Sequence, residues 1–296
     1  LASDGNALLL LQKEFPLLKS FKLPSYNIKY SKTGKNLKFK LLLSVPAIIA
    51  AVKKEHKIIA QLIKKENISG IISDNRFGVY NRNIPSVYIT HQLKVLSGNT
   101  TGITSKTHQK IIKNFNECWV PDFEGEQNFS GNLSHLEKHA FNLKYIGILS
   151  RLKPVKCEIE NDLMVLLSGP EPQRTLLEHK ILEALKKYDK NVLFIRGILN
   201  NNLKLETSYP PVRCAGNIKV IDFLATSDLE KAISKSEIVI ARSGYSTIMD
   251  LAVLGKKAFF IPTAGQFEQE YLAKLMKRKL IAPFSKQQDF KLEKLN

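Results

Sequence analysis

The chain has 296 residues, 44% of them hydrophobic, and a formal net charge of +18 from 45 Lys and Arg against 27 Asp and Glu. This length exceeds that of one ordinary domain, so we expect two. The longest uncharged apolar run, residues 41–52, is shorter than the roughly 20 residues that a spanning helix needs. No secretory signal pattern opens the sequence, and we expect a soluble, cytoplasmic protein.

The positive charge is compatible with several kinds of partner. Excess Lys attracts nucleic acid, anionic membrane or phosphorylated ligands alike. The sequence has no zinc-finger spacing, RNA-recognition signature or arginine-rich tract, so nucleic acid is not expected. Cys118, Cys157 and Cys214 stand far apart without metal-ligand spacing, and we expect them to be small buried hydrophobes.

The N-terminal half alternates amphipathic helices with short apolar strands. Helices are predicted at 6–14, 41–65 and 105–115, and strands at 20–24, 68–73, 85–90, 117–120 and 144–149. His56 lies on the apolar stripe of the second helix and should pack in the core. Alternation of this kind predicts a parallel sheet covered on both faces.

A charged, proline-containing stretch at 150–161 predicts a hinge, which divides the chain into domains 1–150 and 151–296. The second domain repeats the alternation. Its strands are predicted at 163–167, 191–196, 218–221, 237–241 and 257–261, and its helices at 173–187, 227–234 and 246–254. The sequence therefore predicts an α/β protein with two doubly wound, Rossmann-like domains.

Residues 236–262 carry the most informative pattern: a buried strand, a glycine turn, a helix and a second buried strand. Arg242, Ser243 and Gly244 stand at the carboxyl end of the first strand, where open α/β sheets bind ligands. Gly244 allows close backbone approach, and the helix N-terminus that follows favours an anion such as a diphosphate. Asp250 shares a helix face with Thr247, so its carboxylate could accept hydrogen bonds from ribose. Alternatively, Thr247 and Asp250 form a capping box at the start of the helix.

This stretch resembles the donor-binding signature of the inverting GT-B glycosyltransferases, in the family containing the peptidoglycan N-acetylglucosaminyltransferase. The matching residues are Arg242-Ser243-Gly244, Thr247, Asp250, Gly255, Ile261-Pro262, and the segment from Gln266 to Gln269. The resemblance implies two domains facing across a cleft, and a hexosyltransferase-like enzyme of the cell envelope that uses a UDP-sugar. Ser243 and Gly244 would hold the diphosphate, Asp250 the ribose, and Gln269 the sugar hydroxyls. The family usually has Glu where this chain has Asp250.

Other segments follow the order of the same family. Phe223 and Leu224, after the strand at 218–221, would line the base pocket, although Phe223 is also a natural core residue. Ser168 and Gly169 occupy the place of a glycine-rich loop, of which one glycine remains.

In the N-terminal half, His91-Gln92 resembles the end of a family strand, and Asp74 directly follows the predicted strand at 68–73. Asp74 and His91 are the candidates for acid/base work, and the alternative that both line the interdomain cleft without taking part in the chemistry is favoured. Arg76 would lower the pKa of Asp74 if the two pair.

The opening letters LASDGN resemble the end of the family's second strand. We therefore expect roughly thirty residues, one strand–loop–helix unit, to precede position 1. In the family, that unit carries a glycine-rich loop with the catalytic base.

No Asp-x-Asp pair occurs in the sequence, and such a pair would hold a divalent metal under a diphosphate. We therefore expect no cofactor and no metal requirement. The resemblance and the basic charge together suggest a lipid-linked or surface acceptor, with peripheral contact to an anionic inner membrane face. Two alternatives remain open: a sugar-nucleotide epimerase or hydrolase of the same fold, and a non-catalytic basic protein that binds nucleic acid or an anionic surface.

Overall fold

The computed structural model describes residues 1–26, 37–198 and 217–295, and the side chains of 37–45 lie outside this description, as does Cys214. The chain forms two compact units, Leu1–Leu149 and Ser150–Asn296. Within the described residues, no helix is both long enough and apolar enough to cross a membrane.

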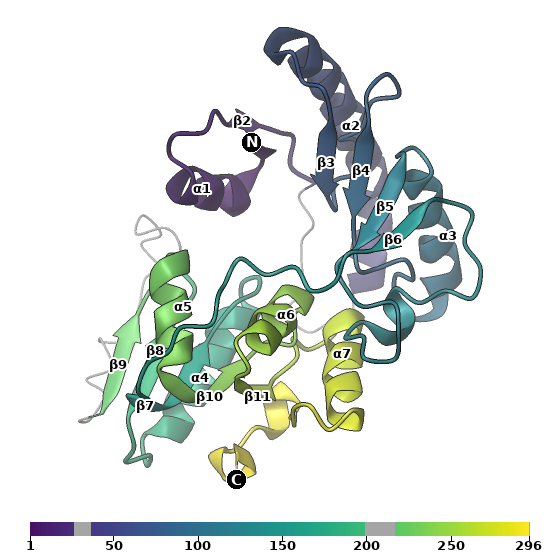
Figure 1. Ribbon diagram of the computed structural model, residues 1–296. Helices are drawn as coiled ribbons and strands as arrows, with labels where there is room; N and C mark the ends of the chain where they lie inside the picture. Colours follow the sequence, from purple (N-terminus) through teal and green to yellow (C-terminus); the bar gives the residue numbers. More distant parts are fainter. Residues whose placement is uncertain (27–36, 199–216, 296) are drawn as a thin grey trace. The chain divides into compact units, whose positions relative to one another are not determined.

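The first unit contains two parallel sheets (Figure 1). β1 (Ala2–Ser3) pairs with β2 (Phe21–Lys22), and a second sheet has the order β3-β4-β5-β6. Its strands are β3 (Ile71–Asp74), β4 (Ser86–Ile89), β5 (Glu117–Val120) and β6 (Leu143–Tyr145), and its helices are α1 (Gly5–Glu14), α2 (Leu37–Glu66) and α3 (Thr101–Ile112). These elements confirm the predicted alternation. β6 is shorter than predicted because it is an edge strand that pairs only with β5.

α2 contributes to one of the hydrophobic clusters of the first unit. It is longer than predicted at both ends and continues through Pro46. Ile59 on α2 packs with Leu23 and Val79, and Ala2 and Ile71 lie against the same cluster. His56 packs against Tyr80, with ring centroids 4.5 Å apart, as its position on the apolar stripe predicted.

Arg76 holds the ends of three strands together. Its guanidinium bonds to the buried Glu55, to Asp4 after β1 and to the carbonyl of Pro24 after β2. The suggested pair of Arg76 with Asp74 is wrong, because Glu55 and Asp4 take the guanidinium instead.

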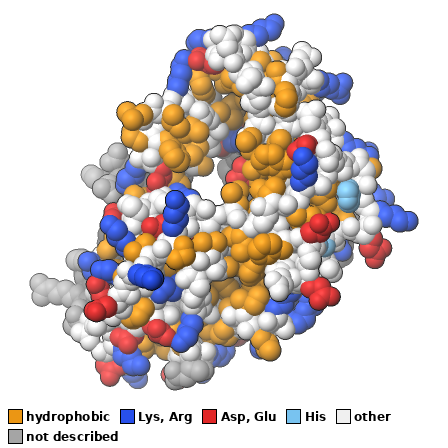
Figure 2. Space-filling model, in the orientation of Figure 1, with side chains coloured by type: hydrophobic (Ala, Val, Ile, Leu, Met, Phe, Trp, Pro, Cys, Tyr) orange, Lys and Arg blue, Asp and Glu red, His pale blue; other side chains and the backbone are white. Residues whose placement is uncertain are grey.

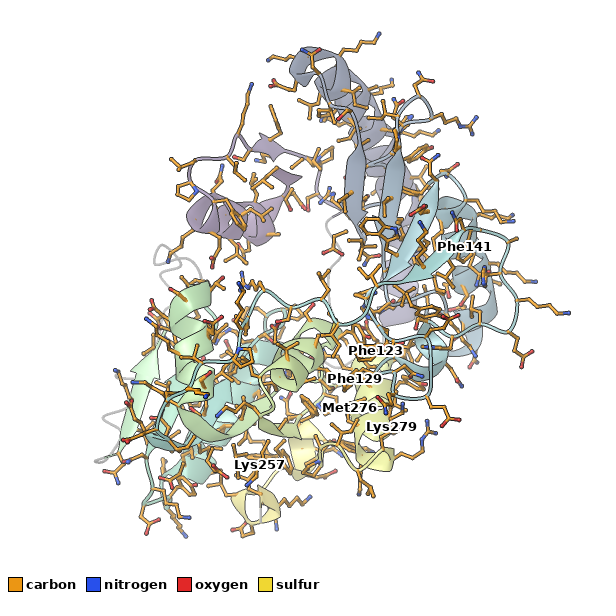
Figure 3. The ribbon with its side chains drawn as sticks, in the orientation of Figure 1. Phe123, Phe129, Phe141, Lys257, Met276 and Lys279 are labelled. Carbon is orange, nitrogen blue, oxygen red and sulfur yellow. The ribbon has the colours of Figure 1, made fainter. Side chains whose placement is uncertain are left out.

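The second unit is a single five-stranded parallel sheet of order β11-β10-β7-β8-β9. Its elements are β7 (Asn161–Leu166), α4 (Gln173–Leu185), β8 (Val192–Ile195), β9 (Ile218–Ile221), α5 (Thr226–Ser234), β10 (Ser236–Ala241), α6 (Tyr245–Val253), β11 (Lys257–Phe260) and α7 (Phe267–Arg278). Both fold-class predictions, parallel sheets and doubly wound order, are confirmed here. α7 buries Met276, which Figure 3 labels.

The order in which strands are added to the sheet changes side between β7 and β10. From β7 the chain runs outward through β8 and β9, then returns to β10 on the other side of β7. The loops after β7 and β10 therefore diverge at a topological switch point, where doubly wound sheets bind ligands.

One cysteine prediction is wrong. Cys118 is buried as expected, but Cys157 is exposed. It lies in the irregular segment before β7, which has no sheet or helix to cover it.

The Arg76–Glu55 cluster leads to a stability prediction at Gly78. A Cβ there would lie 2.5 Å from the Val52 carbonyl oxygen and 2.8 Å from Glu55 Oε2. Gly78→Ala should therefore reduce the free energy of unfolding of the first unit by about 1–3 kcal/mol. The chain has one tryptophan, Trp119 in β5, so its fluorescence in a urea titration follows this unit.

Gly102 provides the matched control. It lies in α3, and a Cβ there would meet nothing within 4 Å. Gly102→Ala should leave stability unchanged or raise it by up to about 1 kcal/mol through helix propensity. Equal unfolding midpoints for Gly78→Ala and the wild-type chain would contradict the tight packing at Gly78.

Candidate functional site

Three strand ends converge at the switch point of the second unit. Ser168 and Gly169 follow β7, Arg242 to Gly244 follow β10, and Thr263 follows β11. The loop after β7 reaches across, since a Cβ at Gly169 would lie 3.8 Å from Thr263 Oγ1. Local alternation of strand and helix explains why all three loops meet at one sheet edge.

Arg242 lies beneath these loops and is 1% exposed. One terminal nitrogen donates to the carbonyls of Ile261 and Pro262, both at 3.1 Å, and the other donates to Gln173 O at 2.8 Å. Its side chain thus joins the ends of β10 and β11 to the start of α4. The sequence grouped Arg242 with the residues that contact the donor, whereas the structure directs its terminal nitrogens at backbone carbonyls.

The charge of Arg242 has no acidic partner among the described ion pairs. Burial alone lowers the pKa of its guanidinium to about 10. Nε is buried and has no hydrogen-bond partner in the described structure. A cation buried without a counter-charge is costly, and a nearby anion offsets that cost.

The N-terminus of α6 offers such an anion site. Gly244 is the N-cap residue, and no side chain caps the helix. A Cβ at Gly244 would meet only Thr247 Oγ1, at 3.9 Å, so the approach to the backbone is open. The buried hydroxyl of Ser243 donates to Gln269 O at 2.8 Å and so ties this turn to α7. Unpaired N–H groups and the helix dipole at such a terminus favour a phosphate.

Asp250 lies in the body of α6 and is half-buried. Ser150 Oγ donates to its Oδ1 at 2.5 Å. Burial raises the pKa of this carboxyl, and the hydrogen bond from Ser150 and the charge of Arg151 oppose the rise. The capping-box alternative is wrong, because Gly244 rather than Thr247 caps α6.

The turn before α7 is held by its own side chains. Gln269 Oε1 accepts from the Thr263 backbone N–H at 2.8 Å, and Gln266 is the N-cap residue. Both glutamines therefore stand beside the loop after β11, next to the N-terminus of α6 in sheet order.

Phe223 and Leu224, predicted to line a base pocket, follow β9 at the far edge of the sheet and are half-buried. A buried ionic network that sequence reasoning missed fixes this edge. Glu178 on α4 accepts from Arg174 and from Arg196, and Arg196 also donates to Asp222 at 2.9 Å. Arg174 and Glu178 lie four residues apart on α4, whereas Arg196 and Asp222 are distant from them in sequence, so local spacing indicates only the first ion pair.

In the first unit, the structure brings Asp74 and His91 together. Asp74 ends β3 and pairs in register with Ile89 of β4, two residues before His91. Partial burial raises the pKa of the Asp74 carboxyl, and the charge of His91 opposes the rise.

Sequence reasoning also missed the buried pair behind these two residues. Tyr88 Oη donates to Asn75 Oδ1 at 2.8 Å and lies 3.0 Å from His108 Nε2. Burial lowers the pKa of His108 to about 4, so its ring is neutral at pH 7. In the sequence, only the position of Tyr88 inside a predicted strand and of His108 inside a predicted helix indicated that they could be buried.

Within the described residues, no group of three or more His, Cys, Asp or Glu side chains could hold a metal ion.

Comparison with solved structures identifies the architecture. MurG from Acinetobacter baumannii superimposes with a TM-score of 0.54 at 13% identity, covering 100% of this chain and 87% of that one. The glycosyltransferase VinC, solved in complex with DTDP, superimposes with a TM-score of 0.54 at 11% identity, covering 99% and 81%. The chain has the GT-B glycosyltransferase fold.

Sequence comparison indicates which glycosyltransferases the chain is similar to. Residues 172–296 match the glycosyltransferase family 28 C-terminal domain. The UDP-N-acetylglucosamine–N-acetylmuramyl-(pentapeptide) pyrophosphoryl-undecaprenol N-acetylglucosamine transferase of Caldicellulosiruptor saccharolyticus is 24% identical over 176 residues, 57% of this chain and 47% of that protein. Its counterpart from Shewanella frigidimarina is 22% identical over 179 residues, 59% and 45% respectively. The matches thus span about half the length of these curated relatives. Over these residues the chain is similar to the family that contains this peptidoglycan transferase, and its fold is that of the GT-B glycosyltransferases.

Proposed function

We propose that the protein is a glycosyltransferase that moves a sugar from a UDP-sugar to an acceptor. The observation that carries the proposal is the uncapped α6 N-terminus at the switch point, beside a buried Arg242 that has no acidic partner among the described residues. A diphosphate bound at Gly244 would supply that counter-charge. Oriented N–H groups there would also stabilise the diphosphate as it leaves.

The donor would lie across residues 151–296 in sheet order. Its base would contact Phe223 and Leu224, and its ribose would contact Asp250. Its diphosphate would contact Ser243, Gly244 and Thr247, with Ser168 and Gly169 beside it. Its sugar would contact Gln266 and Gln269. Arg242 would act from beneath, by holding the three loops in place and by its charge.

Residues 1–150 would form the acceptor side. Asp74, with its raised pKa, is suited to accept a proton from an acceptor hydroxyl, and His91 stands close enough to share that task. Both are proposed as acid/base groups.

Two other functions are less well supported. An epimerase or hydrolase of the same fold would need the same donor site, and transfer to an acceptor distinguishes them. A nucleic-acid-binding protein would be expected to gather its basic side chains into one surface. On the face in Figure 2, Lys and Arg are scattered among acidic side chains.

The donor site predicts that UDP stabilises the protein against heat and that free N-acetylglucosamine does not. Asp250→Ala should weaken UDP binding by about 1.5–3 kcal/mol, the contribution of a hydrogen bond to a charged group, or roughly 10- to 150-fold in Kd. Asp250→Asn keeps one acceptor oxygen and should lose less. Isothermal titration calorimetry measures all three affinities.

Glu183 supplies the control, because it forms an exposed ion pair with Lys186 on α4. Glu183→Ala should bind UDP as the wild type does. Unchanged UDP affinity in Asp250→Ala would remove Asp250 from the site, and no UDP binding by the wild type would reject the donor proposal.

Metal independence is a separate proposal. It is supported by the lack of an Asp-x-Asp pair in the sequence and by the dipole and backbone donors at α6. UDP affinity in EDTA should lie within about twofold of its value with magnesium, because a chelated metal is not what holds the diphosphate. A tenfold gain on adding magnesium would contradict it.

We further propose a lipid-linked acceptor and a place at the cytoplasmic face of the membrane. The curated relatives act on an undecaprenol-linked sugar by name, and this chain is strongly basic. The protein should therefore sediment with vesicles containing anionic lipid at low salt and be released by salt, because charge screening weakens the attraction. Neutral vesicles are the control, and equal sedimentation with both would contradict electrostatic membrane contact.

A further inference from the structure

We propose that the Thr263 hydroxyl hydrogen-bonds the sugar end of the donor and makes the protein distinguish a nucleotide-sugar from the bare nucleotide. This inference rests on the proposed function and adds to it a contact that no sequence pattern predicted.

The first observation is an unsatisfied hydroxyl. Thr263 is 2% exposed, and its Oγ1 is buried without a hydrogen-bond partner in the described structure. Its backbone is fully engaged, since the N–H donates to Gln269 Oε1 and the carbonyl accepts from Gln266 N at 3.1 Å. A buried hydroxyl without a bond is costly, so its retention calls for a partner that arrives later.

The second observation is the residue that faces this hydroxyl. Gly169 faces it with φ +102°, a conformation that side-chain-bearing residues rarely adopt. Apart from its own chain neighbours, Thr263 Oγ1 is the only atom of the described residues within 4 Å of where a Cβ would stand. The loop after β7 therefore places no side chain against the hydroxyl. A ligand group entering between the two loops would have Thr263 as its polar neighbour.

Sheet order indicates which end of the donor this would be. The proposed base residues follow β9, the diphosphate turn follows β10, and Thr263 follows β11, at the opposite edge from β9. A ligand laid across the strand ends in this order passes its diphosphate at Gly244 and brings its sugar to the loop after β11. Sugar hydroxyls can both donate to and accept from a threonine hydroxyl.

The test uses Thr263→Val, which keeps the shape and removes the hydroxyl, with Thr263→Ser as the rescue variant that restores it. UDP and UDP-N-acetylglucosamine are the probes, and calorimetry gives their affinities for each protein. We expect Thr263→Val to bind UDP-N-acetylglucosamine about tenfold more weakly, the loss of one hydrogen bond, and to bind UDP unchanged. Thr263→Ser should bind both probes within about twofold of the wild type.

Thermal unfolding without ligand gives an independent readout. Because the hydroxyl has no partner in the unliganded structure, Thr263→Val should melt at the same temperature as the wild type or higher. A lower melting temperature would mean that the hydroxyl is already bonded, for example to an internal water, and would overturn the proposal.

Three binding results would also overturn it: unchanged affinity of Thr263→Val for UDP-N-acetylglucosamine, an equal loss for both probes, or wild-type affinities that do not differ between the probes. Failure of the wild type to bind either probe is a different result, because it rejects the proposed donor site itself. The two failures are therefore distinguishable in one set of titrations.

Discussion

The guanidinium of Arg242 is the contact on which the second unit's ligand-binding edge depends. Parallel strands end in loops that have no ladder to hold them, and three such loops meet at this edge. Arg242 bonds three backbone carbonyls, on either side of its own strand, and so fixes the loop after β11 and the start of α4 at once. A rigid planar donor with several N–H groups is suited to this task, whereas a lysine would reach fewer acceptors.

Arg76 and Arg242 contrast in their electrostatics. Arg76 is paired with Glu55 and Asp4, so its charge is neutralised within the first unit and its role is to hold strand ends. Within the described residues Arg242 bonds carbonyls and no acidic group, and burial lowers the pKa of its guanidinium. The second unit thus keeps a positive potential next to an uncapped helix N-terminus. Such an arrangement can hold a diphosphate by fixed dipoles and charge, the role a chelated metal plays elsewhere.

The site also combines satisfied and unsatisfied groups in a definite pattern. The side chains of Ser243 and Gln269 form hydrogen bonds within the protein, and these bonds hold the turns before α6 and α7 in place. At the same edge, Thr263 Oγ1 and Arg242 Nε have no hydrogen-bond partner among the described residues. Rigid surroundings with a few open bonds are what preorganised binding requires, because little ordering is left for the ligand to bring about.

The sequence by itself determined the layout of the molecule. Short apolar strands and amphipathic helices are local properties, so the elements that were predicted lie within about four residues of their observed bounds, and β5 and β9 were predicted with those bounds. β1 was not predicted. The strand–glycine–helix pattern also placed Arg242 to Gly244 at a strand end, where the structure has them. α7 was not among the predicted helices, and only its first residues fall in the segment from Gln266 to Gln269 that matched the family resemblance.

Only the tertiary structure decided which groups the side chains meet. Arg76 stands two residues from Asp74, yet it bonds Glu55 and Asp4, which are distant in sequence. No local sequence pattern indicates that the Thr263 hydroxyl is buried without a hydrogen-bond partner among the described residues. The residue that faces it, Gly169, lies 94 positions earlier in the chain. Spacing along the chain fixes which face of an element a residue occupies, whereas hydrogen bonds and charge pairs form between elements that only folding brings together.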